Sequence, residues 1–195
     1  RGFARRMAVA TVAFLALTAS ASVMTRRASL HLAGSSALGA CAACLPAPAR
    51  AQADQKAFQA ALLKDITEKR FMVTGDLSRE LYTPDATFTD EIDTYALDAF
   101  MKGTGNLFDP SASDFKLVGD IAFSEGGHKV SYRFDEILAF RLPLKPRARV
   151  SGRVELTRNE EGLISKYREI WDQSVPETIG GLVQDGLGIR KAAFE

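Results

Sequence analysis

Apolar residues in the first half of the chain recur at the spacing of helices. Between residues 54 and 70 they stand three and four positions apart, at Ala57, Phe58, Ala61, Leu62 and Ile66. That spacing gathers them on one face of an amphipathic helix. Asp76 can cap a second, short helix through residue 82, which Pro84 ends because proline breaks the hydrogen-bond ladder.

A short strand and a third helix are predicted next. Residues 86–90 have the composition of a brief strand. Residues 95–101 are predicted to form a helix that ends before Gly103-Thr104-Gly105, because glycine weakens a helix interior.

From residue 115 onward the apolar period changes to two, as in half-buried strands. Strands are predicted over residues 115–123, 130–140, 148–156 and 163–172, with a hairpin turn at Glu125-Gly126-Gly127-His128. Three helices packed on one face of a curved, mostly antiparallel sheet make an α+β domain.

The charge of the chain is divided between its two ends. The first 53 residues contain six arginines but no Lys, Asp or Glu, whereas residues 54–195 carry 19 basic and 24 acidic residues. A net-acidic body argues against nucleic acid as a partner, because phosphate binding needs a concentrated positive surface.

An acid-free start rich in Arg, Ala and Ser is typical of a targeting leader. We therefore predict a cleaved leader over residues 1–53, a folded domain over 54–175 and a C-terminal tail over 176–195. Neither apolar stretch of the leader has the roughly 18–20 uninterrupted residues of a membrane span, so no span is expected in the mature chain.

The leader contains two signal-like units in succession. Arg26-Arg27, a mild apolar run and Ala49-Arg50-Ala51 resemble a twin-arginine signal, and a preceding unit carries Arg5-Arg6. Stacked units resemble the leader of a plastid protein bound for the thylakoid lumen. A bacterial exported protein or lipoprotein, acylated at Cys41, is the alternative.

Cys41 and Cys44 have the spacing of a redox or metal-binding pair, but they lie within the leader. After cleavage the chain has no cysteine, and His128 is its one histidine. We therefore expect no metal site and no cofactor.

Three features resemble the nuclear transport factor 2-like superfamily, which includes SnoaL-like polyketide cyclases, ketosteroid isomerase and limonene epoxide hydrolase. They are the segment Leu81-Tyr82-Thr83-Pro84-Asp85-Ala86-Thr87-Phe88-Thr89-Asp90, the strand series, and the closing Tyr167-Arg168-Glu169-Ile170-Trp171-Asp172. Plastid members of the superfamily are the most similar. The resemblance implies a cone-shaped fold whose sheet and helices enclose a pocket.

The strand alternation and this resemblance together nominate the pocket lining. The candidates are Phe88, Asp90, Tyr95, Tyr132, Phe134, Glu136, Tyr167, Glu169 and Trp171. Glu136 and Glu169 are the candidate catalytic residues, because a carboxyl group in apolar surroundings has a raised pKa suited to acid–base work. Arg133 and Asp135 fall on the opposite, outward face.

Three functions remain open at this stage. The first is a plastid binding module for a small apolar ligand or a protein partner. The second is an isomerase, cyclase or hydrolase that uses a pocket carboxylate as acid–base group. The third is a non-catalytic assembly subunit whose interior is filled by its own side chains, and a homodimer is compatible with each.

Processing of the leader is directly testable. The mature protein is expected to begin near Gln52 or Asp54, because the small-x-small sites end there. N-terminal sequencing of the protein from its native compartment checks this. A start at Met7 would contradict it, and an acylated Cys41 would favour the lipoprotein alternative.

Overall fold

The computed structural model of the protein describes residues 47–189 and 191–194. Most of the predicted leader, including Cys41 and Cys44, lies outside these residues. Residues 57–195 group into one compact unit by their contacts.

Helices come first along the chain, two short strands and α4 follow, and four longer strands then complete the sheet before the last helix. The helices are α2 (Ala47–Lys64), continued by a wider turn η2 (Asp65–Lys69), α3 (Phe71–Thr74), η3 (Arg79–Leu81), α4 (Leu97–Leu107), η4 (Glu125–Gly127) and α5 (Val175–Gly186). The strands are β1 (Tyr82–Thr89), β2 (Thr94–Ala96), β3 (Asp114–Ser124), β4 (Lys129–Ala139), β5 (Arg147–Arg158) and β6 (Ile164–Trp171).

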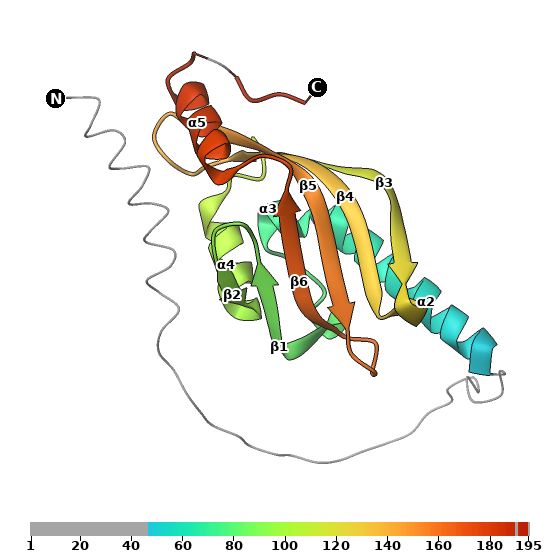
Figure 1. The fold of residues 1–195 in the computed structure, drawn as a ribbon. Coiled ribbons are helices and arrows are strands. Elements are labelled where there is room, and N and C mark those ends of the chain that lie inside the picture. The colour runs from blue at the N-terminus through green and yellow to red at the C-terminus, as the bar shows by residue number, and fades with distance from the viewer. Residues whose placement is uncertain (1–46, 190, 195) are drawn as a thin grey trace, which may run out of the picture. The chain divides into compact units, whose positions relative to one another are not determined.

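The six strands form one curved sheet in the order β2-β1-β6-β5-β4-β3, seen in Figure 1. β1 and β6 are parallel, and every other neighbouring pair is antiparallel. It follows that β1, β4 and β6 run in the same direction. Their carboxyl ends therefore meet at one edge of the sheet, where the candidate acids lie.

Helices pack on the inner face of the sheet and close the hydrophobic core. Phe58 of α2 meets Phe123 of β3 edge-on, with ring centroids 6.3 Å apart, and Leu62 is fully buried. The inward side chains of β4, Val130, Tyr132 and Phe134 among them, are buried as the alternation predicts. The predicted α+β class is thus confirmed.

The predicted elements between the first helix and β3 need correction. The helix predicted from Asp76 is wrong, because α3 ends at Thr74 and only the single turn η3 follows. β1 starts at Tyr82 and runs through Pro84, four residues earlier than predicted. Tyr95 belongs to β2, and α4 continues through the glycines that were expected to end it.

Close approach of two backbones explains why Gly105 of α4 and Gly75 after α3 are glycines. A Cβ on Gly105 would lie 2.8 Å from the carbonyl oxygen of Thr74, and one on Gly75 would collide with the carbonyl of Met101. Gly75 also has a φ of 71°, a left-handed conformation that glycine adopts without strain. The glycines therefore let α4 lie directly against the end of α3.

The predicted C-terminal tail contains a helix that sequence patterning missed. Ser174 and Glu177 form a reciprocal capping box at the start of α5, which offsets the weak helix propensity of its glycines. Asp185, buried on α5, accepts hydrogen bonds from the backbone N–H groups of Arg147 and Ala192. It also pairs with the Arg147 guanidinium at 3.4 Å, so this arginine is partly covered.

Two helical glycines offer a matched test of the α3–α4 packing. Gly105→Ala is expected to lower the free energy of unfolding by about 1–3 kcal/mol, because the new methyl group has no space. Gly180→Ala in α5 meets nothing within 4 Å, and is expected to raise it by about 0.5–1 kcal/mol. Urea unfolding of both variants measures the difference. Equal effects would contradict the packing.

Candidate functional site

Three acidic side chains gather where the carboxyl ends of β1, β4 and β6 meet. Glu136 lies on β4, Glu169 lies on β6, and Asp90 follows the last residue of β1. Thr89 pairs with Arg168 across the parallel strands, which places Asp90 beside Glu169 in the register. We call this edge, defined by Asp90, Glu136 and Glu169, the acidic end of the sheet.

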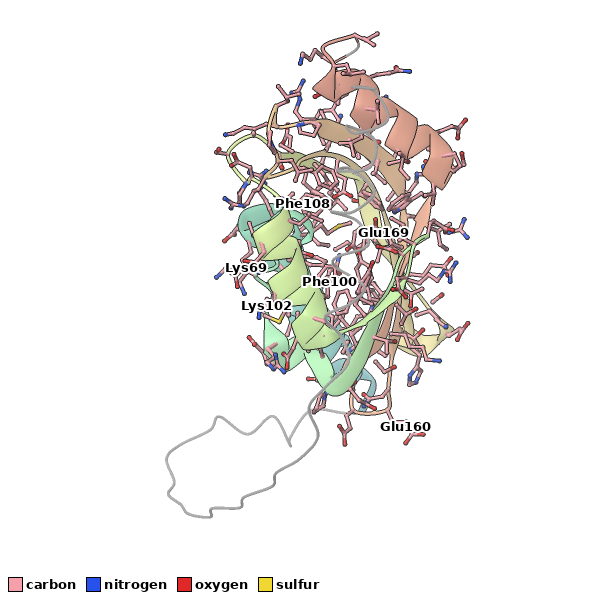
Figure 2. All side chains as sticks on the ribbon, turned by 90° about the vertical axis from the view of Figure 1, so that its left-hand side faces the viewer. Lys69, Phe100, Lys102, Phe108, Glu160 and Glu169 are labelled. Carbon is pink, nitrogen blue, oxygen red and sulfur yellow. The ribbon has the colours of Figure 1, made fainter. Side chains whose placement is uncertain are left out.

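Glu169 is held from both sides by donors on its own strand. Its Oε2 accepts a hydrogen bond from the Tyr167 hydroxyl at 3.0 Å, and its Oε1 accepts one from Trp171 Nε1 at 2.6 Å. All three side chains point inward because they alternate along β6. Figure 2 shows Glu169 inside the curve of the sheet, facing the helix that carries Phe100.

Burial sets the acidity of Glu169, which is only 8% exposed. The pKa of its carboxyl group is raised from the ordinary 4.5 to about 7, chiefly by desolvation. The nearby charges of Asp90 and Glu91 also raise this pKa, whereas the two hydrogen bonds lower it. A carboxyl group with this pKa gains and loses a proton near neutral pH.

Glu136 is buried more completely and is less well satisfied. It is 2% exposed, and its Oε2 has no hydrogen-bond partner. Its neighbours in the sheet are Phe115 on β3 and Val150 on β5. Burial raises the pKa of Glu136 well above its ordinary value, and the charges of Glu169 and Asp90 raise it further.

Neither glutamate has a basic partner among the residues that the structure describes. The ion pairs there use other acids, such as Asp185 with Arg147 and Asp172 with Arg133. The charged groups that shift the pKa values of the two glutamates are all acids. The acidic end therefore holds buried carboxyl groups with no cation beside them among the described residues, a condition that favours their protonated forms.

Stacked aromatic rings form the wall beside these acids. Phe88 of β1 stacks on Phe100 of α4 at 4.0 Å and on Tyr167 of β6 at 4.7 Å between centroids. Phe71 of α3 meets the edge of Tyr167 at 6.1 Å, and Tyr82 stacks on Phe88 at 5.5 Å. The interior beside Glu169 is thus apolar and rich in ring faces.

All four tyrosines of the sequence lie in or beside this region. Tyr82 is buried and its hydroxyl has no hydrogen-bond partner, while the Tyr132 hydroxyl lies 3.9 Å from Met72 Sδ. Burial raises the pKa of the Tyr82, Tyr132 and Tyr167 hydroxyls, so all three stay protonated. Tyr132 and Tyr167 are thus neutral hydrogen-bond donors near the two glutamates.

The remaining candidates take more peripheral places. Asp90 is half-buried, and its Oδ1 accepts hydrogen bonds from the backbone N–H groups of Ile92 and Asp93. Burial nonetheless raises its pKa. Tyr95 is also half-buried, and burial together with Asp90 raises the pKa of its hydroxyl. Trp171, predicted to point fully inward, is half-buried at the rim.

Two groups of side chains lie elsewhere, as the sequence predicts. Arg133 is on the outer face of β4, where it pairs with Asp172, and His128 is exposed in the turn before β4. Conversely, the sequence pattern does not identify Phe71, Phe100 and Tyr82 as residues of this aromatic cluster. For Phe71 and Phe100, the contacts between helices and sheet carry no local sequence signal. Tyr82 falls at the end of a predicted helix, whereas in the structure it begins β1.

Within the described part of the chain, no group of three or more His, Cys, Asp or Glu residues is arranged to hold a metal ion. The helices described here include none that is both long and apolar enough to cross a membrane.

The fold is that of the nuclear transport factor 2-like proteins, including the SnoaL-like cyclases. BvnE pinacolase from Penicillium brevicompactum superposes with a TM-score of 0.51 at 12% identity, over 69% of this chain and 94% of that one. A SnoaL-like polyketide cyclase from Jannaschia sp. CCS1 gives 0.47 at 13% identity, over 68% and 91%. A nuclear transport factor 2-like protein from Salmonella enterica gives 0.48 at 12% identity, over 64% and 94%.

These likenesses concern the fold alone. No protein-family model matches the sequence. A search of curated protein sequences finds no match either.

The raised pKa of Glu169 makes stability depend on pH in a stated direction. The pKa of Glu169 is about 7 in the folded chain and 4.5 in the unfolded chain, so the folded state binds the proton more tightly. The stabilisation of the fold by this proton is complete below pH 4.5 and is lost as the pH rises through 7. The free energy of unfolding is expected to fall over this window, by an amount on the order of 3 kcal/mol from Glu169.

Glu169→Gln is expected to flatten that fall, because the amide cannot ionise; its oxygen can still accept from Trp171, while its NH2 group would donate to the Tyr167 hydroxyl. Urea unfolding between pH 4.5 and 8 measures it, with Glu155→Gln on the exposed side of β5 as the matched control. Identical pH profiles in the wild type and Glu169→Gln would contradict the assignment.

Proposed function

We propose that the protein binds a small, largely apolar ligand at the acidic end of the sheet. One observation carries this proposal: Glu136 is buried, and its Oε2 has no hydrogen-bond partner among the residues that the structure describes. A buried polar group without a hydrogen bond destabilises the fold by about 1–3 kcal/mol, so proteins seldom keep one without a use. A ligand that donates to Glu136 would satisfy it.

The aromatic wall supports an apolar ligand body. Phe88, Phe100 and Tyr167 stack on one another beside Glu169, so the surroundings of this acid are apolar. Ligand sites combine such a lining with a small number of placed polar groups. Glu136, Glu169 and the tyrosine hydroxyls would supply those groups here.

Proton transfer is the second function that a specific observation favours. Glu169 has a pKa of about 7 and is fixed by Tyr167 and Trp171. A general acid–base group works best when its pKa is near the working pH and its position is fixed. An isomerase, cyclase or hydrolase would use Glu169 as the proton carrier and a neutral tyrosine as the hydrogen-bond donor to a substrate oxygen.

The location of this activity is proposed from the leader. The acid-free composition and twin arginines of residues 1–53 favour a plastid protein of the thylakoid lumen, and the Cys41 alternative places it in a bacterial envelope. Either address would put the domain in a membrane-bounded compartment.

Co-purification tests the proposed function. The purified chain is expected to carry a small molecule, identified by mass spectrometry, that Glu136→Gln loses. Stability of this variant is expected to stay within about 1 kcal/mol of the wild type at pH 4, because a neutral amide then replaces a neutral acid and no buried cation loses its partner. Glu160→Gln, an exposed change on the turn before β6, is the matched control.

Two outcomes would contradict the proposal. One is a ligand retained equally by Glu136→Gln. The other is a chain that neither carries nor takes up a small molecule, in which case the interior serves only to hold an assembly subunit together.

A further inference from the structure

The acidic end brings together three carboxyl groups that have no cationic partner among the described residues, and a neutral apolar molecule would not supply one. Asp90, Glu136 and Glu169 come from three strands, and no described ion pair includes any of them. One atom also points to a missing partner, because Glu136 Oε2 is buried and has no hydrogen-bond partner among the described residues.

A protonated amine supplies what these groups lack. An ammonium group has three N–H donors and no acceptor, so it matches carboxylate oxygens that need donors. Its charge also offsets the repulsion between Glu136 and Glu169. We propose that the ligand of this site is a small hydrophobic amine, bound as its ammonium ion between Glu136 and Glu169.

The aromatic wall suits the same ligand. Ring faces attract cations, and the attraction is worth about 2 kcal/mol or more when the cation is desolvated. Phe88, Phe100 and Tyr167 stack on one another beside Glu169, and Phe100 and Trp171 are only partly buried, so these two rings are the ones that a bound cation would contact. An apolar amine would place its hydrocarbon part on these rings and its nitrogen at the carboxylates.

Other ligand classes fit less well. A carboxylate or phosphate would add negative charge to a buried acidic region. A calcium ion needs six to eight oxygen ligands, whereas the wall here is aromatic and the described residues hold no metal-binding group of three. A neutral alcohol can donate one hydrogen bond but brings no charge.

Binding of an ammonium ion also has a definite proton balance. Burial and the neighbouring charges raise the pKa of Glu136, which favours the protonated form of this acid in the unoccupied site. The ammonium nitrogen keeps its own protons, and the Glu136 proton leaves to solvent as the ion pair forms. Amine binding is therefore coupled to proton release, whereas alcohol binding is not.

This inference rests on the proposed function, because it names the ligand class for the same site. Trp171 is the single tryptophan of the sequence and donates to Glu169, so its fluorescence reports binding directly. The probes are cyclohexylmethylamine, cyclohexylmethanol and cyclohexanecarboxylate, which share one hydrocarbon body and differ in charge. They are titrated into the purified chain at pH 7.

The amine is expected to bind at least tenfold more tightly than the alcohol, and the carboxylate more weakly than both. Glu136→Gln is expected to lose at least tenfold in amine affinity with little change for the alcohol, and the surface variant Glu160→Gln is expected to match the wild type. Calorimetry in two buffers of different ionisation enthalpy is expected to show proton release with the amine only. This calorimetric measurement needs no variant.

Alcohol binding as tight as amine binding would overturn the amine assignment and leave the proposed function standing. Amine binding without proton release, or undiminished in a folded Glu136→Gln, would also overturn it. If none of the three probes changes Trp171 fluorescence or produces binding heat, both the amine assignment and the proposed binding function fail.

Discussion

Two glutamates buried in one interior without a cation are the constraint on which the rest of this site depends. Each ionised carboxylate would have to leave water and face the other's charge, so the protein favours their protonated forms. The surrounding groups follow from this condition. The neutral Tyr167 hydroxyl and the Trp171 indole hold Glu169 by hydrogen bonds without adding positive charge.

The topology of the sheet creates the constraint. Because β1 is parallel to β6, and β4 runs in the same direction, three carboxyl ends reach the same edge. Alternation then turns Glu136 and Glu169 toward the helices. The close α3–α4 contact completes the interior, since it brings Phe71 and Phe100 against Phe88 and Tyr167.

Structure and sequence agree best where a local pattern decides the outcome. Strand alternation correctly predicted that Tyr132, Phe134 and Glu136 face inward, because one buried face fixes the register. The local patterns failed at Gly105 and in α5, because glycines lower the helix propensity of both segments. A backbone contact with Thr74 and a capping box at Ser174 decide those two cases, and neither has a periodic signal.

The two buried acids can be titrated individually, which tests the central claim most directly. NMR of the side-chain carboxyl carbons in ¹³C-labelled protein, assigned with Glu136→Gln and Glu169→Gln, follows each group from pH 4 to 9. The expected result is a midpoint near 7 for Glu169 and a clearly raised one for Glu136. Midpoints near 4.5 for both would show that water or a cation reaches these carboxylates, and would contradict the account.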